Sequence, residues 1–342
     1  MNNIRIRQLL INSIRNFFKK EDFLEVETPL LVPNPDPSPY NELFETTKIC
    51  GKRAFLTPSP EFLMKKLIAT KKFPKIFQIC KAFRNPQELD PLHNPEFTIL
   101  EWYRINATYI DLMLDCENLI SFIVEKLKQK FQISNFKFQI KKSKLKNFIN
   151  YQNTWIDITP PWQRITLKEA FYKFANINLD EFLNLKKAKK IAKKKGYQVE
   201  KNTTWEQIYH QIFLNEIEPN LPKEKPIILY DYPSQLAALS KLKEKDKRYA
   251  ERFEFYIGGL ELGNGYSELN NAAEQEKRLK ADIQLRKKMG MLVFDYDKDF
   301  VKAVGKMPKC AGIAVGIDRL IMLFSNAKTI QEVISFPATK IF

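Results

Sequence analysis

The feature that most constrains the fold is a pair of segments rich in aromatic and branched residues, at 76–84 (IFQICKAFR) and 96–103 (EFTILEWY). This composition is typical of β-strands, and only a polar loop at 85–95 separates the two segments. The sequence therefore predicts an antiparallel strand pair with an unusually long connection. Long loops between well-formed strands commonly carry function, so this loop is a candidate part of a binding site.

A second strand pair is predicted at 252–265 (RFEFYIGGLELGNG), where two adjacent glycines can form a tight hairpin turn. With a two-residue turn, Tyr256 lies opposite Glu261, and Glu254 points to the same face as Tyr256. Glu254 and Glu261 then converge on one face of the sheet. Two carboxylates this close are unfavourable without a cation between them, so the pattern favours a ligand such as Mg²⁺ or an amine. The alternative is a hairpin whose glutamates face solvent.

Helices are predicted near both ends of the chain. Apolar residues from Ile6 to Phe18 recur at helical spacing, and an extended segment follows them up to Pro29. At 312–324 (GIAVGIDRLIMLF), small residues precede an apolar helix that carries a single Asp-Arg pair. This pattern is typical of a backbone that approaches a ligand closely, with Arg319 directed at that ligand from the start of a helix. A strand-to-helix join in the core would look similar apart from the arginine.

The chain is basic, with 56 Lys and Arg against 40 Asp and Glu and a net charge of +16. Three quarters of this excess, from 18 basic against 6 acidic residues, falls within 121–200. Seven lysines at 186–195 surround small apolar residues and predict an amphipathic helix that ends at Gly196. The charge suggests an anionic partner; a solvated helix face and compositional drift toward lysine are the alternatives.

Composition excludes several other classes of protein. No window approaches the ~18 consecutive apolar residues that a membrane span requires, so we expect a cytoplasmic protein with no membrane segment. The four cysteines lie 30 or more residues apart without a CxxC pair, which argues against a zinc site or a disulfide scaffold. With 342 residues and 13% aromatic content, the chain can fill one large domain or two small ones.

Three segments resemble, in order, the signature motifs of class II aminoacyl-tRNA synthetases of the lysyl branch: FLEVETPLL at 23–31, Phe83-Arg84 followed by HNPEFTILEWY at 93–103, and GIAVGIDRL at 312–320. The segment RFEFYIGGLELGNGYSELN at 252–270 resembles the lysine-binding segment of that branch. The resemblance implies an α+β fold, the class II catalytic fold, with an antiparallel sheet flanked by helices. It also implies a single catalytic domain over 1–342, with a basic, insertion-like region at about 121–200.

Two members of this branch differ at the N-terminus. A lysyl-tRNA synthetase carries an anticodon-binding OB domain ahead of its first catalytic helix, whereas Ile6 already lies on that helix here, so we expect no N-terminal OB domain. The chain therefore resembles the elongation factor P lysine ligase family. That family activates (R)-β-lysine with ATP and transfers it to a lysine side chain of elongation factor P, an acidic partner that suits a basic surface.

Local spellings separate the possible functions. SPEFLMKK at 59–66 and MPKCAGIAVGIDR at 307–319 agree with the ligase family, and Ser59 and Ala314 stand where synthetases typically have Ala and Gly. Gly263 and the YSELN spelling resemble ordinary lysyl-tRNA synthetases instead. A truncated synthetase that charges tRNA with lysine is therefore the main alternative, and a non-enzymatic paralogue is the third.

The resemblance also implies the site residues. In the nucleotide site, Arg84 would hold the α-phosphate, Arg319 the γ-phosphate end, and Phe97 would stack on adenine. The implied ATP-binding set is Arg84, Asn85, Asn94, Phe97, Glu261, Leu262, Gly316 and Arg319; the substrate-binding set is Ser59, Pro60, Glu61, Tyr103, Glu268 and Ala314; Mg²⁺ would be bound by Glu254 and Glu261. Within the substrate pocket, Glu61 would bind the backbone-side amine, and Glu268 with Tyr103 the ε-ammonium.

Two further expectations concern the nucleotide loop and the assembly. The family usually reads FRNE, with the glutamate on adenine, whereas this chain reads FRNPQE at 83–88. Either Gln87 or Glu88 takes the adenine role, or the loop has lost a contact. A homodimer is expected as well, because the first helix and the FLEVETP strand form the subunit contact in this class.

Overall fold

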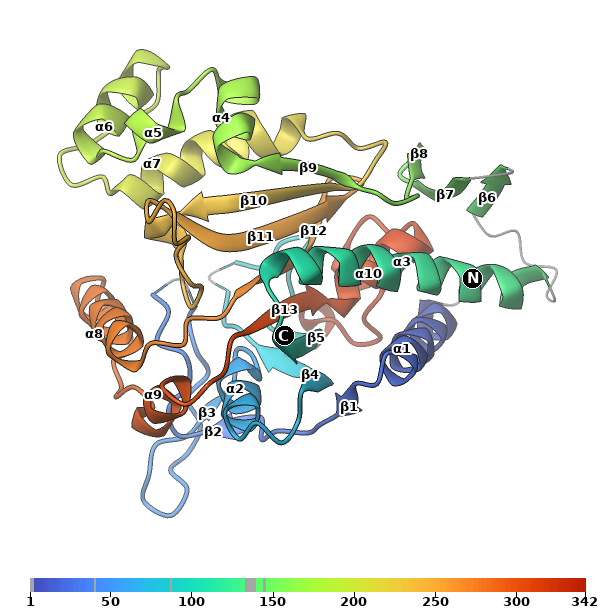
Figure 1. Ribbon diagram of the computed structural model, residues 1–342, viewed down its shortest axis with the longest axis horizontal. Coiled ribbons are helices and arrows are strands. Elements are labelled where there is room, and N and C mark those ends of the chain that lie inside the picture. The colour runs from blue at the N-terminus through green and yellow to red at the C-terminus, as the bar shows by residue number, and fades with distance from the viewer. Residues whose placement is uncertain (1–2, 40, 87, 133–139, 144–145) are drawn as a thin grey trace.

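The computed structural model describes residues 3–39, 41–86, 88–132, 140–143 and 146–342. Its centre is an eight-stranded sheet (Figure 1) in the order β1 (Leu24–Glu25), β4 (Lys75–Phe83), β5 (Glu96–Ile105), β13 (Cys310–Gly316), β12 (Leu260–Ser267), β11 (Tyr249–Ile257), β10 (Ile227–Pro233) and β9 (Gln163–Thr166). The six strands from β4 to β10 in this order pair antiparallel, and only the edge strands β1 and β9 pair parallel with their neighbours. The predicted α+β fold with an antiparallel sheet is confirmed.

Both predicted strand pairs are present. β4 and β5 pair antiparallel across the long 84–95 loop. In the second pair, Gly258 and Gly259 form the turn with φ angles of +62° and +83°, which favour glycine, and Tyr256 lies opposite Glu261 as predicted. The register then shifts, so that Glu254 lies opposite Asn264, one residue further along β12 than a regular hairpin gives.

The largest core cluster joins the sheet to α1 (Asn3–Lys20), α3 (Tyr109–Gln132) and α10 (Ile317–Ser325), with α1 and α3 side by side in Figure 1. The apolar residues at helical spacing in α1 are the ones that become buried: Ile6, Leu10, Ile14, Phe17 and Phe18. Phe18 stacks on Phe77 of β4 with ring centroids 4.6 Å apart. The predicted N-terminal helix is confirmed, and its apolar face anchors it to the sheet.

A second cluster of buried residues covers the β9–β10 end of the sheet. It is formed by α4 (Leu167–Ala175), α5 (Leu179–Phe182), α6 (Leu185–Lys194), α7 (Trp205–Ile212) and the π-helical turn Phe213–Ile217. The predicted lysine-rich helix is α6, with Ala188 and Ala192 buried and Gly196 in the left-handed region after it. The basic stretch 121–200 thus runs from α3 through a small sheet of β6 (Ile140–Ser143), β7 (Lys146–Tyr151) and β8 (Thr154–Asp157) into α4–α6.

A third group of elements lies at the left and lower left in Figure 1 and borders the site described next. It contains β2 (Leu31–Val32), β3 (Phe55–Leu56), α2 (Glu61–Ala69), α8 (Ala272–Lys288) and α9 (Lys298–Val304). Phe62 of α2 stacks on Phe300 of α9 with ring centroids 3.8 Å apart, which fixes α2 against α9. The chain ends in a short helix, α11 (Ala338–Ile341). None of the helices in the described residues is long and apolar enough to cross a membrane.

Candidate active site

A cleft of about 590 Å³ opens where the 84–95 loop meets the end of β13 and the start of α10. Its lining includes all eight residues predicted to bind ATP: Arg84, Asn85, Asn94, Phe97, Glu261, Leu262, Gly316 and Arg319. These residues come from three segments that are far apart in the sequence. The structure brings the eight together, while nucleotide binding by them stays a prediction.

A smaller pocket of about 100 Å³ adjoins the cleft and shares Arg84, Asn264 and Ala314 with it. Four of the six predicted substrate residues line this pocket: Ser59, Glu61, Tyr103 and Ala314. The remaining two, Pro60 and Glu268, are buried close by, Pro60 directly before α2 and Glu268 directly after β12. A molecule in the pocket can therefore reach the cleft past Arg84.

Arg84 and Phe97 form one side of the cleft at the open ends of β4 and β5. The Arg84 guanidinium lies 5.2 Å from the centroid of the Phe97 ring, and the Arg84 amide donates to the Pro95 carbonyl at 3.0 Å. Among the described residues, no carboxylate forms an ion pair with Arg84. Its planar donors are thus available to an anion in the cleft, beside an aromatic face.

Arg319 approaches the cleft from the first turn of α10. One guanidinium nitrogen donates to the Glu261 carbonyl at 2.9 Å and lies 3.3 Å from a carboxylate oxygen of the same residue. Another lies 2.7 Å from His93 Nε2, and His93 Nδ1 lies 2.7 Å from Asp90. His93, and the Leu92 carbonyl that accepts from Arg319 Nε at 3.4 Å, thus link the 84–95 loop to Arg319.

Glu254 and Glu261 are close but have different surroundings. Glu254 is buried, with one oxygen 2.8 Å from Arg252 and the other accepting from the Tyr256 hydroxyl at 2.7 Å. Glu261 lines the cleft, and burial together with the Glu254 charge raises its pKa. A third acidic, histidine or cysteine ligand beside this pair is absent from the described residues. Such a pair fits a Mg²⁺ ion whose other ligands are phosphate oxygens and water, as Mg²⁺ commonly requires.

Glu101 of β5 also lines the pocket, although it was not among the predicted substrate residues. It is 1% exposed, and its carboxylate accepts hydrogen bonds from Ser59 Oγ at 2.5 Å and from the Tyr103 hydroxyl at 2.9 Å. Burial and the charge of Glu61 raise the pKa of Glu101 to about 8. The Tyr103 hydroxyl, which the resemblance assigns with Glu268 to the ε-ammonium, thus donates to Glu101 in the structure.

The Glu268 side chain lies beside Gly312, which lines the substrate pocket. It is 3% exposed, and burial, with a further effect from the charge of Glu61, raises its pKa to about 8 against the opposing effect of Lys65. A Cβ atom on Gly312 would lie 2.1 Å from the Tyr103 ring and 2.6 Å from Glu268 Oε1. Only glycine leaves room there for both side chains.

Other predicted residues have structural partners. The Asn94 side chain donates to the Glu96 carbonyl at 2.7 Å and accepts from the Ala338 amide at 3.0 Å, so it ties α11 to the start of β5. The backbone N–H of Asn85 donates to the Glu42 carbonyl at 3.0 Å. Gly316 precedes α10. Glu88 lines the cleft, whereas Gln87 lies outside the described residues.

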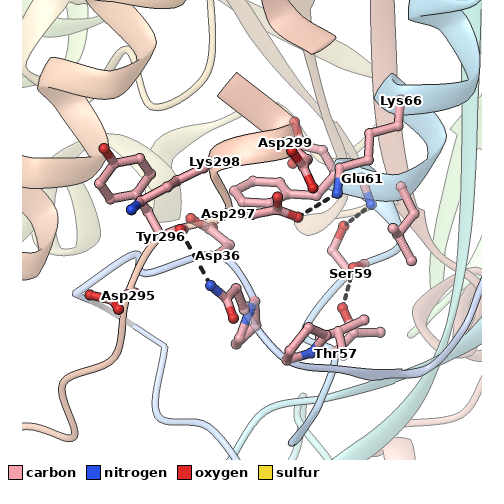
Figure 2. A pocket seen from close by; sticks show the side chains of 16 residues that line it. Asp36, Thr57, Ser59, Glu61, Lys66, Asp295, Tyr296, Asp297, Lys298 and Asp299 are labelled. Carbon is pink, nitrogen blue, oxygen red and sulfur yellow. Dashed lines mark hydrogen bonds and ion pairs between the residues drawn. The ribbon is translucent and has the colours of Figure 1, made fainter. Parts of the chain in front are cut away.

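Figure 2 shows a third cavity, of about 360 Å³, which shares Asp36, Ser59 and Glu61 with the substrate pocket. Asp295, Asp297 and Asp299 face it from the segment before and at the start of α9, and Lys66 of α2 lies 2.5 Å from Asp297. Burial, then the charge of Glu61, raises the pKa of Asp36 to about 7. Negative charge therefore surrounds the start of α2 on two sides, which favours cationic ligands.

Comparison with known families gives a match over residues 1–340 to the model of class II tRNA synthetases of the D, K and N group. The chain belongs to this family. The resemblance drawn from the three motifs is thereby confirmed, and the cleft and pocket lie where the second and third of these motifs meet: the ends of β4 and β5 and the junction of β13 with α10.

Individual class II relatives carry two different names. A lysine--tRNA ligase of Buchnera aphidicola subsp. Cinara cedri is 36% identical over 98% of this chain, and another, of Wigglesworthia glossinidia brevipalpis, is 33% identical over 99%. The chain spans 63% and 65% of the length of these two proteins. An elongation factor P--(R)-beta-lysine ligase of Buchnera aphidicola subsp. Acyrthosiphon pisum is 35% identical over 98% of this chain and 94% of the relative.

The altered loop after Arg84 gives a first test in this class II site. We expect Glu88→Ala to weaken ATP binding about threefold to tenfold, because a lost hydrogen bond to the adenine amino group costs roughly 0.5–1.5 kcal/mol. Isothermal titration of ATP measures the effect. Glu96→Ala is the matched control, since Glu96 is paired with Lys81 and lies outside the cleft. Equal ATP affinity of Glu88→Ala and wild type contradicts a replacement role for Glu88.

Proposed function

We propose that the protein is an ATP-dependent ligase that activates (R)-β-lysine as the adenylate and transfers it to a lysine side chain of elongation factor P. The observation that carries the proposal is the shared position of Ser59 and Ala314, the two residues that depart from the usual synthetase spelling. Ser59 donates to Glu101, and Ala314 lies opposite Glu101 in the β5–β13 register. Both departures therefore reshape the surroundings of one buried carboxylate in the substrate pocket.

The first step is attack of the substrate carboxylate on the ATP α-phosphorus, with pyrophosphate leaving. Arg84 is placed to bind both the carboxylate and the α-phosphate, since it borders the pocket and the cleft. Arg319 would bind the γ-phosphate end, and Phe97 would stack on adenine. Mg²⁺ held by Glu261 and Glu254 would neutralise charge on the phosphates. The residues thus act by positioning and charge neutralisation.

In the second step the neutral amine of an acceptor lysine attacks the carbonyl carbon of the mixed anhydride. A C–N bond forms, the C–O bond to AMP breaks, and AMP leaves with the electron pair. The attacking nitrogen loses one proton. We infer that the substrate's own amine, in its free-base form, accepts this proton.

Pyrophosphate exchange with lysine and (R)-β-lysine side by side, followed by transfer to elongation factor P or to tRNA, tests the proposal. We expect exchange with (R)-β-lysine and label on elongation factor P. Exchange with lysine followed by charging of tRNA would overturn it and favour the function for which the lysine--tRNA ligases are named. Absence of exchange with both amino acids would favour a non-enzymatic paralogue.

Substrate binding should depend on pH. Glu101 and Glu268, each with a pKa of about 8, are largely protonated in the empty pocket at pH 6, whereas a bound ammonium favours their ionised forms. Affinity for a diamino acid should therefore rise between pH 6 and pH 8, by up to about tenfold per unit for each proton released. Titration calorimetry in two buffers counts these protons. Glu101→Gln should flatten the curve, and equal affinity at pH 6 and pH 8 contradicts the prediction.

We further propose a cytoplasmic homodimer. The apolar side chains of Leu24 on β1 and Leu31 on β2 are 48% and 40% exposed. Exposed apolar side chains in the FLEVETPLL segment are expected if a second subunit covers this surface. The lysines of α6 are mostly exposed and suit an acidic partner such as elongation factor P, or tRNA under the alternative function.

A further inference from the structure

Lys65 lies in the site region but was not among the predicted site residues. It lies one helical turn after Glu61 on α2, and its side chain is only 1% exposed. Of the lysines that the structure describes, Lys65 alone is buried. An ammonium group is costly to bury unless carboxylates surround it, so its position requires an explanation.

The Lys65 ammonium lies between two of the predicted substrate carboxylates. Its Nζ is 2.5 Å from Glu61 Oε1 and 2.5 Å from Glu268 Oε2, and it lies 5.2 Å from the centroid of the Tyr266 ring. Although burial favours the neutral amine, the charges of Glu268 and Glu61 outweigh it and raise the pKa of Lys65. Because Glu61 Oε1 and Glu268 Oε2 each lie 2.5 Å from the same Lys65 Nζ, these two oxygens are at most 5.0 Å apart.

The same carboxylates keep capacity for a second cation. Apart from the ion pair with Lys65, neither oxygen of Glu268 accepts a hydrogen bond from the described residues, although both are buried. Glu61 also accepts from the Tyr266 hydroxyl and lines the pocket. When Glu61, Glu101 and Glu268 are all ionised, as a bound ammonium favours, the three carboxylates and the Lys65 ammonium carry a summed charge of −2, which matches a ligand with two ammonium groups.

On the basis of the proposed function, we infer that Lys65 is a positioning residue that sets which diamino acid fits, by holding Glu61 and Glu268 at a fixed spacing. The two nitrogen atoms of lysine are separated by five carbon atoms, and those of β-lysine by four. The Lys65 ammonium holds the Glu61 and Glu268 carboxylates at a fixed spacing. A pocket with this fixed spacing distinguishes the longer lysine from the shorter β-lysine. Without that cation, the two like charges separate or take up protons, and the distinction is lost.

The test compares Lys65→Met, which removes the charge at similar volume, with Lys65→Arg and with Lys66→Met as the matched control. Lys66 is the next residue on α2, and its ammonium binds Asp297 rather than Glu61 or Glu268. Pyrophosphate exchange is measured with lysine and with (R)-β-lysine for each variant. ATP affinity is measured by calorimetry as a check that the cleft is intact.

For Lys65→Met we expect the amino-acid KM to rise at least tenfold, kcat to change less than threefold, and the preference between the two diamino acids to fall at least fivefold. Lys65→Arg should restore part of the affinity, and Lys66→Met should behave as wild type. Unchanged KM and preference in Lys65→Met would overturn the inference. If Lys65→Met also loses ATP binding, the Lys65→Arg variant decides. Lys65→Arg with intact ATP binding and a wild-type preference between the two diamino acids overturns the inference. Lys65→Arg with intact ATP binding and an altered preference supports the inference.

The same data separate this inference from the proposed function. Wild-type protein that exchanges with neither diamino acid contradicts the proposed function, whereas active wild type with a silent Lys65→Met contradicts only the role of Lys65.

Discussion

Arg84→Ala is expected to lower kcat/KM for pyrophosphate exchange by about 10²- to 10³-fold, equivalent to roughly 3–4 kcal/mol of transition-state stabilisation. Arg84 borders both the pocket and the cleft, and no described carboxylate forms an ion pair with it. It is therefore the cation best placed to bind the substrate carboxylate and the α-phosphate together as charge develops between them. Arg319, in contrast, already binds Glu261 and lies beside His93.

The conservative variant and a neighbouring lysine make this prediction specific. Arg84→Lys keeps the charge but loses the planar pair of donors, so an intermediate loss of about tenfold is expected. Lys81→Ala removes a cation from the same strand, β4, that is paired with Glu96 and lies outside the cleft; it should leave the rate unchanged. An Arg84→Ala rate within threefold of wild type contradicts the predicted role.

Gly312→Ala should raise the KM for the amino acid by about 10- to 100-fold, because overpacking of this kind costs roughly 1–3 kcal/mol. The added methyl group would lie 2.1 Å from the Tyr103 ring and 2.6 Å from Glu268 Oε1, and both side chains are buried. Steady-state pyrophosphate exchange measures the change in KM. Tyr103 would be displaced from Glu101, so the pH dependence of amino-acid binding should change as well.

ATP affinity is the internal control for this variant. Gly312 lines the substrate pocket but not the cleft, so the affinity for ATP should stay within about twofold of wild type. A variant with normal amino-acid KM shows that the pocket tolerates the methyl group and contradicts the assignment of a strict glycine position. Loss of both affinities would indicate a wider collapse of β13 against β5 and would contradict it as well.

Much of the framework could be predicted from local pattern. The spacing of apolar residues predicts the two strand pairs, the helix from Ile6 to Phe18 and the helix within 186–195. Apolar residues that recur with the period of a strand or a helix lie on one face of that element, and this face becomes buried. The glycine pair at 258–259 fixed the hairpin turn. The register shift beyond the turn could not be predicted, because a bulge depends on how β12 packs against β13 and not on the turn itself.

Motif spelling pointed to only part of the candidate site. Residues in recognisable motifs were found, and the structure brings the predicted ATP set together around one cleft. Asn94 has a structural partner in α11 that the motif could not reveal. Glu101 and Lys65 were not among the predicted site residues, because a carboxylate in a strand and a lysine on a helix resemble ordinary solvated residues until their burial is known.

The sequence by itself determined the family, the strand pairs and the residue types that can bind phosphate or ammonium groups, since these depend on local spacing and on motif spelling. Only the tertiary structure decided which charges meet. Lys65 and Glu61 are one helical turn apart, but Glu268 joins them from β12, about two hundred residues later in the chain. This pairing arises because α2 packs against the sheet and excludes water from the Lys65 ammonium and the two carboxylates. A buried charge without a partner is costly, so the fold is stable only when these opposite charges lie together.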